Sequence, residues 1–109
     1  MKIENMDKFL QEIGRAPLLS KEEELVLLKA VREKGSDCDE MEQLCQSSMR
    51  FVVALAAQYQ HRGLKLEKLI PIGAEGLKKA AMGYGFESDI PFIKYAVPLM
   101  RQCLEEAVS

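Results

Sequence analysis

The helical spacing of apolar residues along nearly the whole chain limits the fold more than any other feature of this sequence. Apolar side chains recur every three or four positions, and no segment keeps for long the alternation of a half-buried β-strand. Glycine and proline interrupt the pattern at a few points, where helices usually end. The sequence therefore predicts an all-α fold, a single bundle of about five helices.

The first two helices are predicted from the signals at their ends. Residues 4–13 have helical spacing, and Gly14 is placed to end this helix in a left-handed conformation. The run S-K-E-E at residues 20–23 is a capping box, in which the serine and the last glutamate satisfy each other's backbone amides. We expect the second helix to start there and to stop near Gly35.

The third helix is expected to be the longest and the most central. It runs from about residue 38 to residue 61, and its apolar arc is wide enough for neighbours on more than one side. Phe51 and Val53 widen the main stripe on either side. That stripe consists of Met41, Leu44, Cys45, Ser48, Val52, Leu55, Ala56 and Tyr59.

Small residues mark the fourth helix, which we expect at about residues 66–81. Gly73 and Gly76 lie on one side of it and would let a neighbouring helix approach closely. After a glycine-rich turn, Ser88 or Asp89 is expected to cap the fifth helix.

Two prolines fall in this last helix. Pro91 is tolerated in the first turn, where the missing amide hydrogen has no partner anyway. Pro98 is interior and removes a backbone donor. We expect it on the outer face with Lys94 and Arg101, where water can take the place of the lost amide.

Catalysis and metal binding have little support. His61 is the only histidine, and no group of His, Cys, Asp and Glu has metal-ligand spacing. A histidine at a helix C-terminus more often complements the helix dipole than acts as a base. We therefore expect no enzymatic activity, no catalytic residue, no metal and no cofactor.

Composition favours a soluble cytoplasmic protein. The three cysteines cannot all pair, and no apolar run has the length of a signal peptide or a membrane span. The formal net charge of −2 does not by itself indicate a nucleic-acid binder. We expect reduced thiols, a cytoplasmic location and no membrane partner.

The fifth helix carries a stripe that mixes aromatic and hydrogen-bonding groups and is flanked by Lys94 and Arg101. Rings beside basic side chains are what a single-strand nucleic-acid binder uses. Rings at this spacing more often belong to the core, so both interpretations stay open. The stripe consists of Phe92, Tyr95, Leu99 and Gln102.

Four stretches fall in an order and spacing that a known family shares. They are DKFLQEIGRAPLLSKEEE at residues 7–24, MRFVVALAAQYQHRGLKLEKLI at 49–70, GLKKAA at 76–81 and PFIKYAVPLMRQ at 91–102. Together they resemble the sigma-70 family, the promoter-recognition subunits of bacterial RNA polymerase. The resemblance implies a region 1.2-like helical segment at residues 1–36 and a region 2-like helical domain at residues 37–109.

The resemblance also implies contacts to DNA. In the family the last helix captures the non-template strand of the promoter −10 element as it melts, and an earlier segment meets the discriminator DNA just downstream. Capture of an unstacked base relies on stacking and hydrogen bonds. The expected DNA-contacting residues are Phe92, Lys94, Tyr95, Arg101 and Gln102 on the last helix, with Phe9 and Leu10 on the first.

The chain departs from the family pattern at this face. Pro98 and Leu99 stand where family members usually carry two tryptophans, and neither offers a ring for stacking. Glu105 and Glu106 add negative charge to a helix that would face DNA. We expect promoter melting to be weakened.

A second implied surface docks on a coiled coil of the largest subunits of core RNA polymerase. The expected contacts are Met49, Lys68, Pro71 and Ile72. Lys68 stands where the family usually presents an acidic residue, a reversal that opposes docking at an interface rim. We expect Ile72, Pro98 and Leu99 to form new exposed apolar surface.

Two functions remain as alternatives. The first is a sigma-factor-like transcription initiation protein that binds core RNA polymerase and −10 promoter DNA with weakened activity. The second is a degenerate sigma-like interaction module that regulates polymerase, a sigma factor or an anti-sigma factor. Binding to a fork-junction DNA with a −10 sequence distinguishes them, because only the first requires it. A structured remnant without function is a third, weaker alternative.

Overall fold

Five α-helices make up the regular structure in the computed structural model, which describes residues 3, 5–15, 19–85 and 90–109. They are α1 (Met6–Arg15), α2 (Lys21–Lys34), α3 (Asp39–Ala57), α4 (Leu66–Gly83) and α5 (Phe92–Val108). Within these ranges there is no strand, so the prediction of an all-α bundle is confirmed. Over the same residues, no helix has the length and apolar character needed to cross a membrane.

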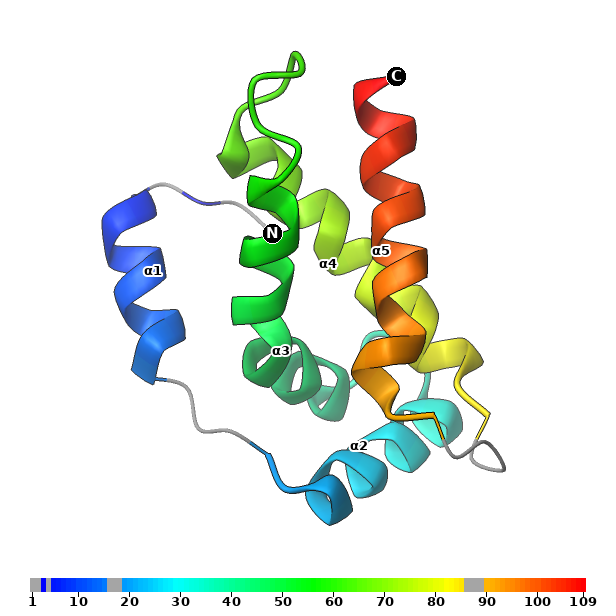
Figure 1. Ribbon diagram of the computed structural model, residues 1–109. Helices are drawn as coiled ribbons and strands as arrows, with labels where there is room; N and C mark the ends of the chain where they lie inside the picture. The colour runs from blue at the N-terminus through cyan, green and yellow to red at the C-terminus, as the bar shows by residue number, and fades with distance from the viewer. Residues whose placement is uncertain (1–2, 4, 16–18, 86–89) are drawn as a thin grey trace.

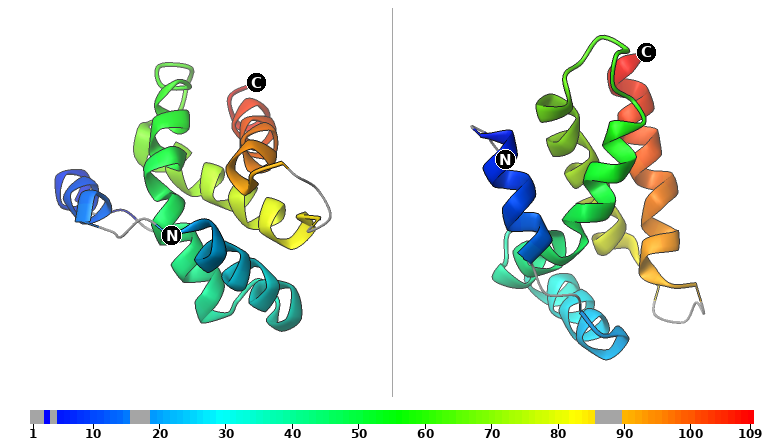
Figure 2. Two further views of the ribbon diagram at one scale, coloured as in Figure 1. Left: turned by 60° about the horizontal axis from the view of Figure 1, so that its bottom comes forward. Right: turned by 60° about the vertical axis from the view of Figure 1, so that its left-hand side comes forward.

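Helices α2 to α5 surround one core, and α1 lies at its edge. α3 is central, α4 and α5 lie side by side, and α2 crosses one end of the bundle (Figure 1). Turned views show the same placement of α1, which packs chiefly against α3 (Figure 2). No residue of α1 is fully buried, whereas each of the other helices contributes buried residues to the core.

The capping box at the start of α2 forms as predicted. The Ser20 hydroxyl accepts a hydrogen bond from the Glu23 amide at 3.1 Å, and the Ser20 amide donates to the Glu23 carboxylate at 3.1 Å. Hydrogen bonding by Ser20, mainly through its backbone amide, lowers the pKa of Glu23. At the other end Gly35 has a φ of 97° and donates to the Val31 carbonyl, so this helix ends where the sequence predicts.

The predicted stripe of α3 is confirmed, because all of its residues are buried, Ser48 included. Phe51 is different: its side chain is 47% exposed, so the buried arc is narrower on that side than predicted. The predicted end of the helix is also wrong. α3 stops at Ala57, and His61 lies beyond it with a φ of 69°, a left-handed conformation that no α-helix accommodates.

Two further helix ends differ from the prediction. Gly14 does not end α1, which continues to Arg15, because the residue adopts helical rather than left-handed geometry. The N-cap of α5 is Pro91, whose φ of −56° is preset by its ring and which makes no side-chain cap bond. The predicted caps Ser88 and Asp89, like the predicted start of α1 at residue 4, lie outside the described residues.

Close packing of α4 depends on its two glycines, as predicted. A Cβ atom on Gly76 would lie 2.7 Å from the Cα atom of Met100 on α5. A Cβ atom on Gly73 would lie 3.1 Å from Cγ1 of Val52 on α3. Gly73 therefore allows close packing of α4 against α3, and Gly76 allows close packing of α4 against α5.

Both interior prolines are accommodated in continuous helices. Pro71 lies within α4 and Pro98 within α5. Pro98 is exposed together with Lys94 and Arg101, as predicted, so the carbonyl without an amide partner is on the solvent side.

Candidate docking groove and nucleic-acid face

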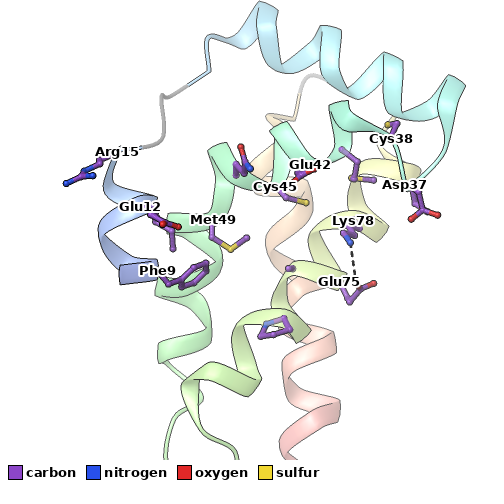
Figure 3. Close-up of a pocket in the computed structure, with 16 residues that line it drawn as sticks. Phe9, Glu12, Arg15, Asp37, Cys38, Glu42, Cys45, Met49, Glu75 and Lys78 are labelled. Atoms are coloured by element: carbon purple, nitrogen blue, oxygen red, sulfur yellow. Dashed lines mark ion pairs between the residues drawn. The ribbon is translucent and has the colours of Figure 1, made fainter. Parts of the chain in front are cut away.

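An open groove of about 770 Å³ lies between α1, α3 and α4. Phe9 and Ile13 line it from α1, and the Phe9 ring is directed toward Met49 on α3 (Figure 3). The remaining apolar lining comes from the other two helices. It consists of Met41, Cys45 and Met49 on α3, of Cys38 at the N-cap of α3, and of Pro71 and Ala74 on α4.

Acidic side chains dominate the rim of this groove. Glu12 lies on α1, Asp37 on the turn before α3 and Glu42 on α3, and none of them forms an ion pair with a described residue. Glu75 is paired with Lys78 at 3.6 Å (Figure 3). Apart from this pair and one arginine at the end of α1, the charges around the apolar lining are negative.

The Cys45 thiol in the groove is structural rather than reactive. Its residue is only 6% exposed, and this burial raises the pKa of the thiol to about 11. The thiolate, which is the nucleophile and metal ligand, is therefore scarce at neutral pH. In the part of the chain that the structure describes, no group of three or more His, Cys, Asp and Glu is arranged to hold a metal ion.

The residues predicted to contact polymerase divide into two pairs. Met49 and Pro71 line the groove, although Met49 is only 4% exposed. Lys68 is exposed on α4 and Ile72 packs partly against the core, and neither lines the groove. The groove thus brings together Met49 on α3 and Pro71 on α4, two residues that are 22 positions apart in the sequence.

The expected new apolar surface is not where the sequence placed it. Ile72 and Leu99 both pack partly against the core, and of the three residues only Pro98 is exposed. Within the described residues, the large apolar side chains that are exposed are Leu10, Val26, Phe51, Met82 and Ile90.

The aromatic residues predicted to contact DNA are mostly engaged inside the protein. Phe92 is 1% exposed, and its ring packs edge-on against Tyr84 with centroids 5.5 Å apart. Its assignment to the DNA-contacting set is therefore corrected to core, since it cannot stack on a base without leaving the interior. Tyr95 is half-buried, and its hydroxyl donates to the Gly83 carbonyl at 3.0 Å.

The polar residues of this face are exposed but have partners. Arg101 donates from Nη1 to Oε1 of Gln58 at 3.1 Å, which ties α5 to the residue after α3. Gln102 donates to Oε1 of Glu106 at 3.4 Å. Lys94 is exposed on the same helix. The outer face of α5 therefore presents cationic and amide groups without an exposed ring beside them.

The two residues predicted to contact discriminator DNA lie in different environments. Phe9 is half-buried and lines the groove, whereas Leu10 is 40% exposed. Phe9 is therefore part of the groove, and the DNA contacts of Phe9 and Leu10 stay predictions.

Tyr84 has a structural role that was not predicted from the sequence. This residue is buried, its ring packs on Phe92, and its hydroxyl donates to the Ile90 carbonyl at 2.7 Å. Arg32 on α2 donates to the Tyr84 carbonyl at 2.9 Å, so the residue joins three helices. The only signal in the sequence was an aromatic residue between two glycines in a predicted turn.

The comparisons with known proteins agree with this architecture. Residues 5–35 match the family model described as Sigma-70 factor, region 1.2. The chain is similar to RNA polymerase sigma factor SigA of Clostridium acetobutylicum, with 38% identity over 101 residues, which is 93% of this chain and 26% of that protein. These matches support a segment of the sigma-70 family. The resemblance predicted from four stretches is thereby confirmed.

Two further relatives match this chain with similar identity and coverage. SigA proteins of Listeria monocytogenes and Lactococcus lactis subsp. lactis are each 34% identical, over 101 and 102 residues, with the same shares of both chains covered. The chain therefore spans about a quarter of the length of the relatives it matches. The family-model match covers α1 and α2, so one wall of the groove comes from the region 1.2 segment.

Proposed function

We propose that this sigma-70-like chain acts in transcription initiation in the cytoplasm by docking on core RNA polymerase through the groove, and that it captures −10 promoter DNA only weakly. The observation that carries docking is that Met49 and Pro71, from different helices, line one open apolar groove. One helix of a coiled coil could lay its apolar side chains in such a groove. The relatives are named RNA polymerase sigma factors, which favours the same partner.

Weak capture of DNA follows from the composition of the α5 face. Stacking supplies a large part of single-strand binding, and it requires accessible rings. Phe92 is in the core, Pro98 and Leu99 have no aromatic ring, and Tyr95 is half-buried. The contacts that remain for the non-template strand are the exposed Lys94, Arg101 and Gln102 on α5. They can hold phosphates and base edges without supporting a flipped base.

Titration of a fluorescently labelled chain with core RNA polymerase tests the docking. Pro71→Arg places a long cation in the groove and is expected to weaken binding at least about tenfold. Val26→Arg is the matched control, because Val26 is exposed on α2 and does not line the groove. Absence of wild-type binding at micromolar polymerase, or equal binding by both variants, would contradict docking through this surface.

A second candidate function is that of an interaction module that regulates polymerase, a sigma factor or an anti-sigma factor without capturing DNA. The burial of Phe92 and the exposed Glu105 and Glu106 on α5 favour it. Anisotropy with a labelled fork-junction DNA carrying a −10 sequence separates the two functions. Weak affinity that falls further with Lys94→Ala supports residual capture, and no detectable binding supports the module. Nanomolar affinity that drops with Tyr95→Ala would refute both weak capture and the module.

A further inference from the structure

Helix α1 presents apolar side chains that it does not bury. None of its residues is fully buried, and it packs chiefly against α3. Phe9 and Ile13 nevertheless project into the groove and remain only half-buried there. Apolar surface that is partly hydrated in the free protein is a source of binding free energy for a ligand that covers it.

We propose that α1 is a clamp that forms the third wall of the docking groove and closes on a basic amphipathic helix of the partner. The inference rests on the proposed docking function, because it names the part of this chain that grips the docked segment. It assigns Phe9 and Ile13 to protein binding, and it leaves the opposite side of α1 free.

The size of the groove indicates a clamp rather than a cover. With α1 in place, about 770 Å³ remain open between it and the lining from α3 and α4. An α1 that blocked the site would have filled this volume with its own side chains. A docked helix that inserts apolar residues at the usual three- and four-residue spacing would instead contact all three walls.

The charge of the rim selects the kind of helix. Glu12, Asp37 and Glu42 come from three different segments and have no described counter-ion. Of the two cations in the lining, Lys78 is already paired with Glu75, and Arg15 lies at the end of α1, so carboxylates outnumber cations. A helix with Lys or Arg beside its apolar stripe would bring positive charge to these carboxylates, whereas an acidic helix would be repelled.

The two sides of α1 supply a matched control. Phe9 and Ile13 line the groove, whereas Leu10 is 40% exposed and does not. Substitution by alanine preserves helix propensity at all three positions. Because no residue of α1 is fully buried, these variants leave the core intact, which circular dichroism and a thermal melt verify.

The first experiment uses a synthetic amphipathic peptide with leucines at the groove-facing positions and flanking lysines, and a glutamate-flanked peptide as its control. Both are titrated against the full chain. We expect the lysine peptide to bind at least about tenfold more tightly than the glutamate peptide. We also expect Phe9→Ala with Ile13→Ala to reduce this binding about tenfold, and Leu10→Ala to leave it unchanged.

Hydrogen exchange on the same samples reports on the clamp directly. Amides of residues 6–15 are expected to exchange more slowly when the lysine peptide or core polymerase is bound. Asp37→Asn with Glu42→Gln is expected to weaken binding of the lysine peptide and to make that binding less dependent on salt concentration. Glu33→Gln with Glu67→Gln, two exposed carboxylates outside the groove, is the control and is expected to have no effect.

Several results would overturn the inference. Tighter binding after Phe9→Ala with Ile13→Ala would mean that α1 covers the groove. Unchanged exchange in α1 on binding, no binding of the lysine peptide, or equal binding of the glutamate peptide would each refute the clamp as stated. Peptide binding without polymerase binding would refute the proposed function alone. Polymerase binding that ignores Phe9 and Ile13 would refute the clamp alone.

Discussion

Helix α1 and the α4–α5 pair differ in how closely they pack against the rest of the chain, although all three helices are amphipathic. The pair is in backbone contact, since a Cβ atom on Gly76 would lie 2.7 Å from the Met100 Cα atom. Across from it, α1 has no fully buried residue and leaves an open groove beside its apolar side chains. Amphipathicity therefore does not by itself determine how completely a helix is buried. The pair obtains its stability from close packing within the chain, and α1 retains apolar surface for another molecule.

The largest expected effect comes from comparing one phenylalanine in each region. Phe92→Ala removes a fully buried ring and is expected to cost about 3–5 kcal/mol of unfolding free energy. Phe9→Ala removes a half-buried ring from α1 and is expected to cost about 1 kcal/mol. Urea unfolding followed by circular dichroism measures both. Equal losses would show that α1 belongs to the same cooperative core and would break the comparison.

A smaller effect, of opposite sign in the two regions, is expected from Gly→Ala substitutions within helices. Gly76→Ala gains helix propensity but forces α4 and α5 apart, for a net loss of about 1–2 kcal/mol. Gly14→Ala meets nothing within 4 Å. It is expected to stabilise α1 locally by up to about 1 kcal/mol, with little effect on global unfolding. Thermal melts of the two variants measure this difference, and a stabilised Gly76→Ala protein would contradict the packing argument.

The smallest effect is expected from the Cys45 thiol, which lies across the groove from α1. Burial raises its pKa to about 11 from an ordinary value of 9.0, so the unfolded chain loses this proton first. The contribution to stability is complete below pH 9.0 and declines as pH rises toward about 11.

The measurement is the unfolding free energy of the wild type minus that of Cys45→Ser, followed across this pH range. We expect the difference to shift against the wild type as pH rises, because serine does not titrate there. A difference independent of pH would mean that the groove admits enough water to ionise the thiol, and that α1 shields it less than the structure indicates.

Features set by residues close in the chain could be predicted from the sequence. The capping box joins Ser20 to Glu23, three positions away, and it formed as expected. The buried stripe of α3 was also correct, because periodicity reports on a helix face directly. Within the candidate site, the family resemblance placed Met49 and Pro71 on one surface, and both residues line the groove.

Features that depend on neighbours distant in the chain could not be predicted. Periodicity could not decide between core and surface for Phe92, because that depended on Tyr84 packing against it from the turn after α4. It placed Phe51 in the core, where no side chain covers the ring fully. The family resemblance, for its part, placed Phe9 and Leu10 together at discriminator DNA, whereas the helix turns Phe9 into the groove and leaves Leu10 exposed.

By itself, the sequence determined that this chain forms amphipathic helices, where α2 begins and ends, which face of α3 is apolar, and which family the chain resembles. Those properties follow from local capping, from residue spacing and from short motifs. Only the tertiary structure decided how deeply each apolar face is buried, because burial depends on which other helix arrives at that face and how closely. Gly76 allowed α5 to close on α4 completely. Among the described helices, none packs as closely on α1, which has no fully buried residue, and the groove beside it remains open.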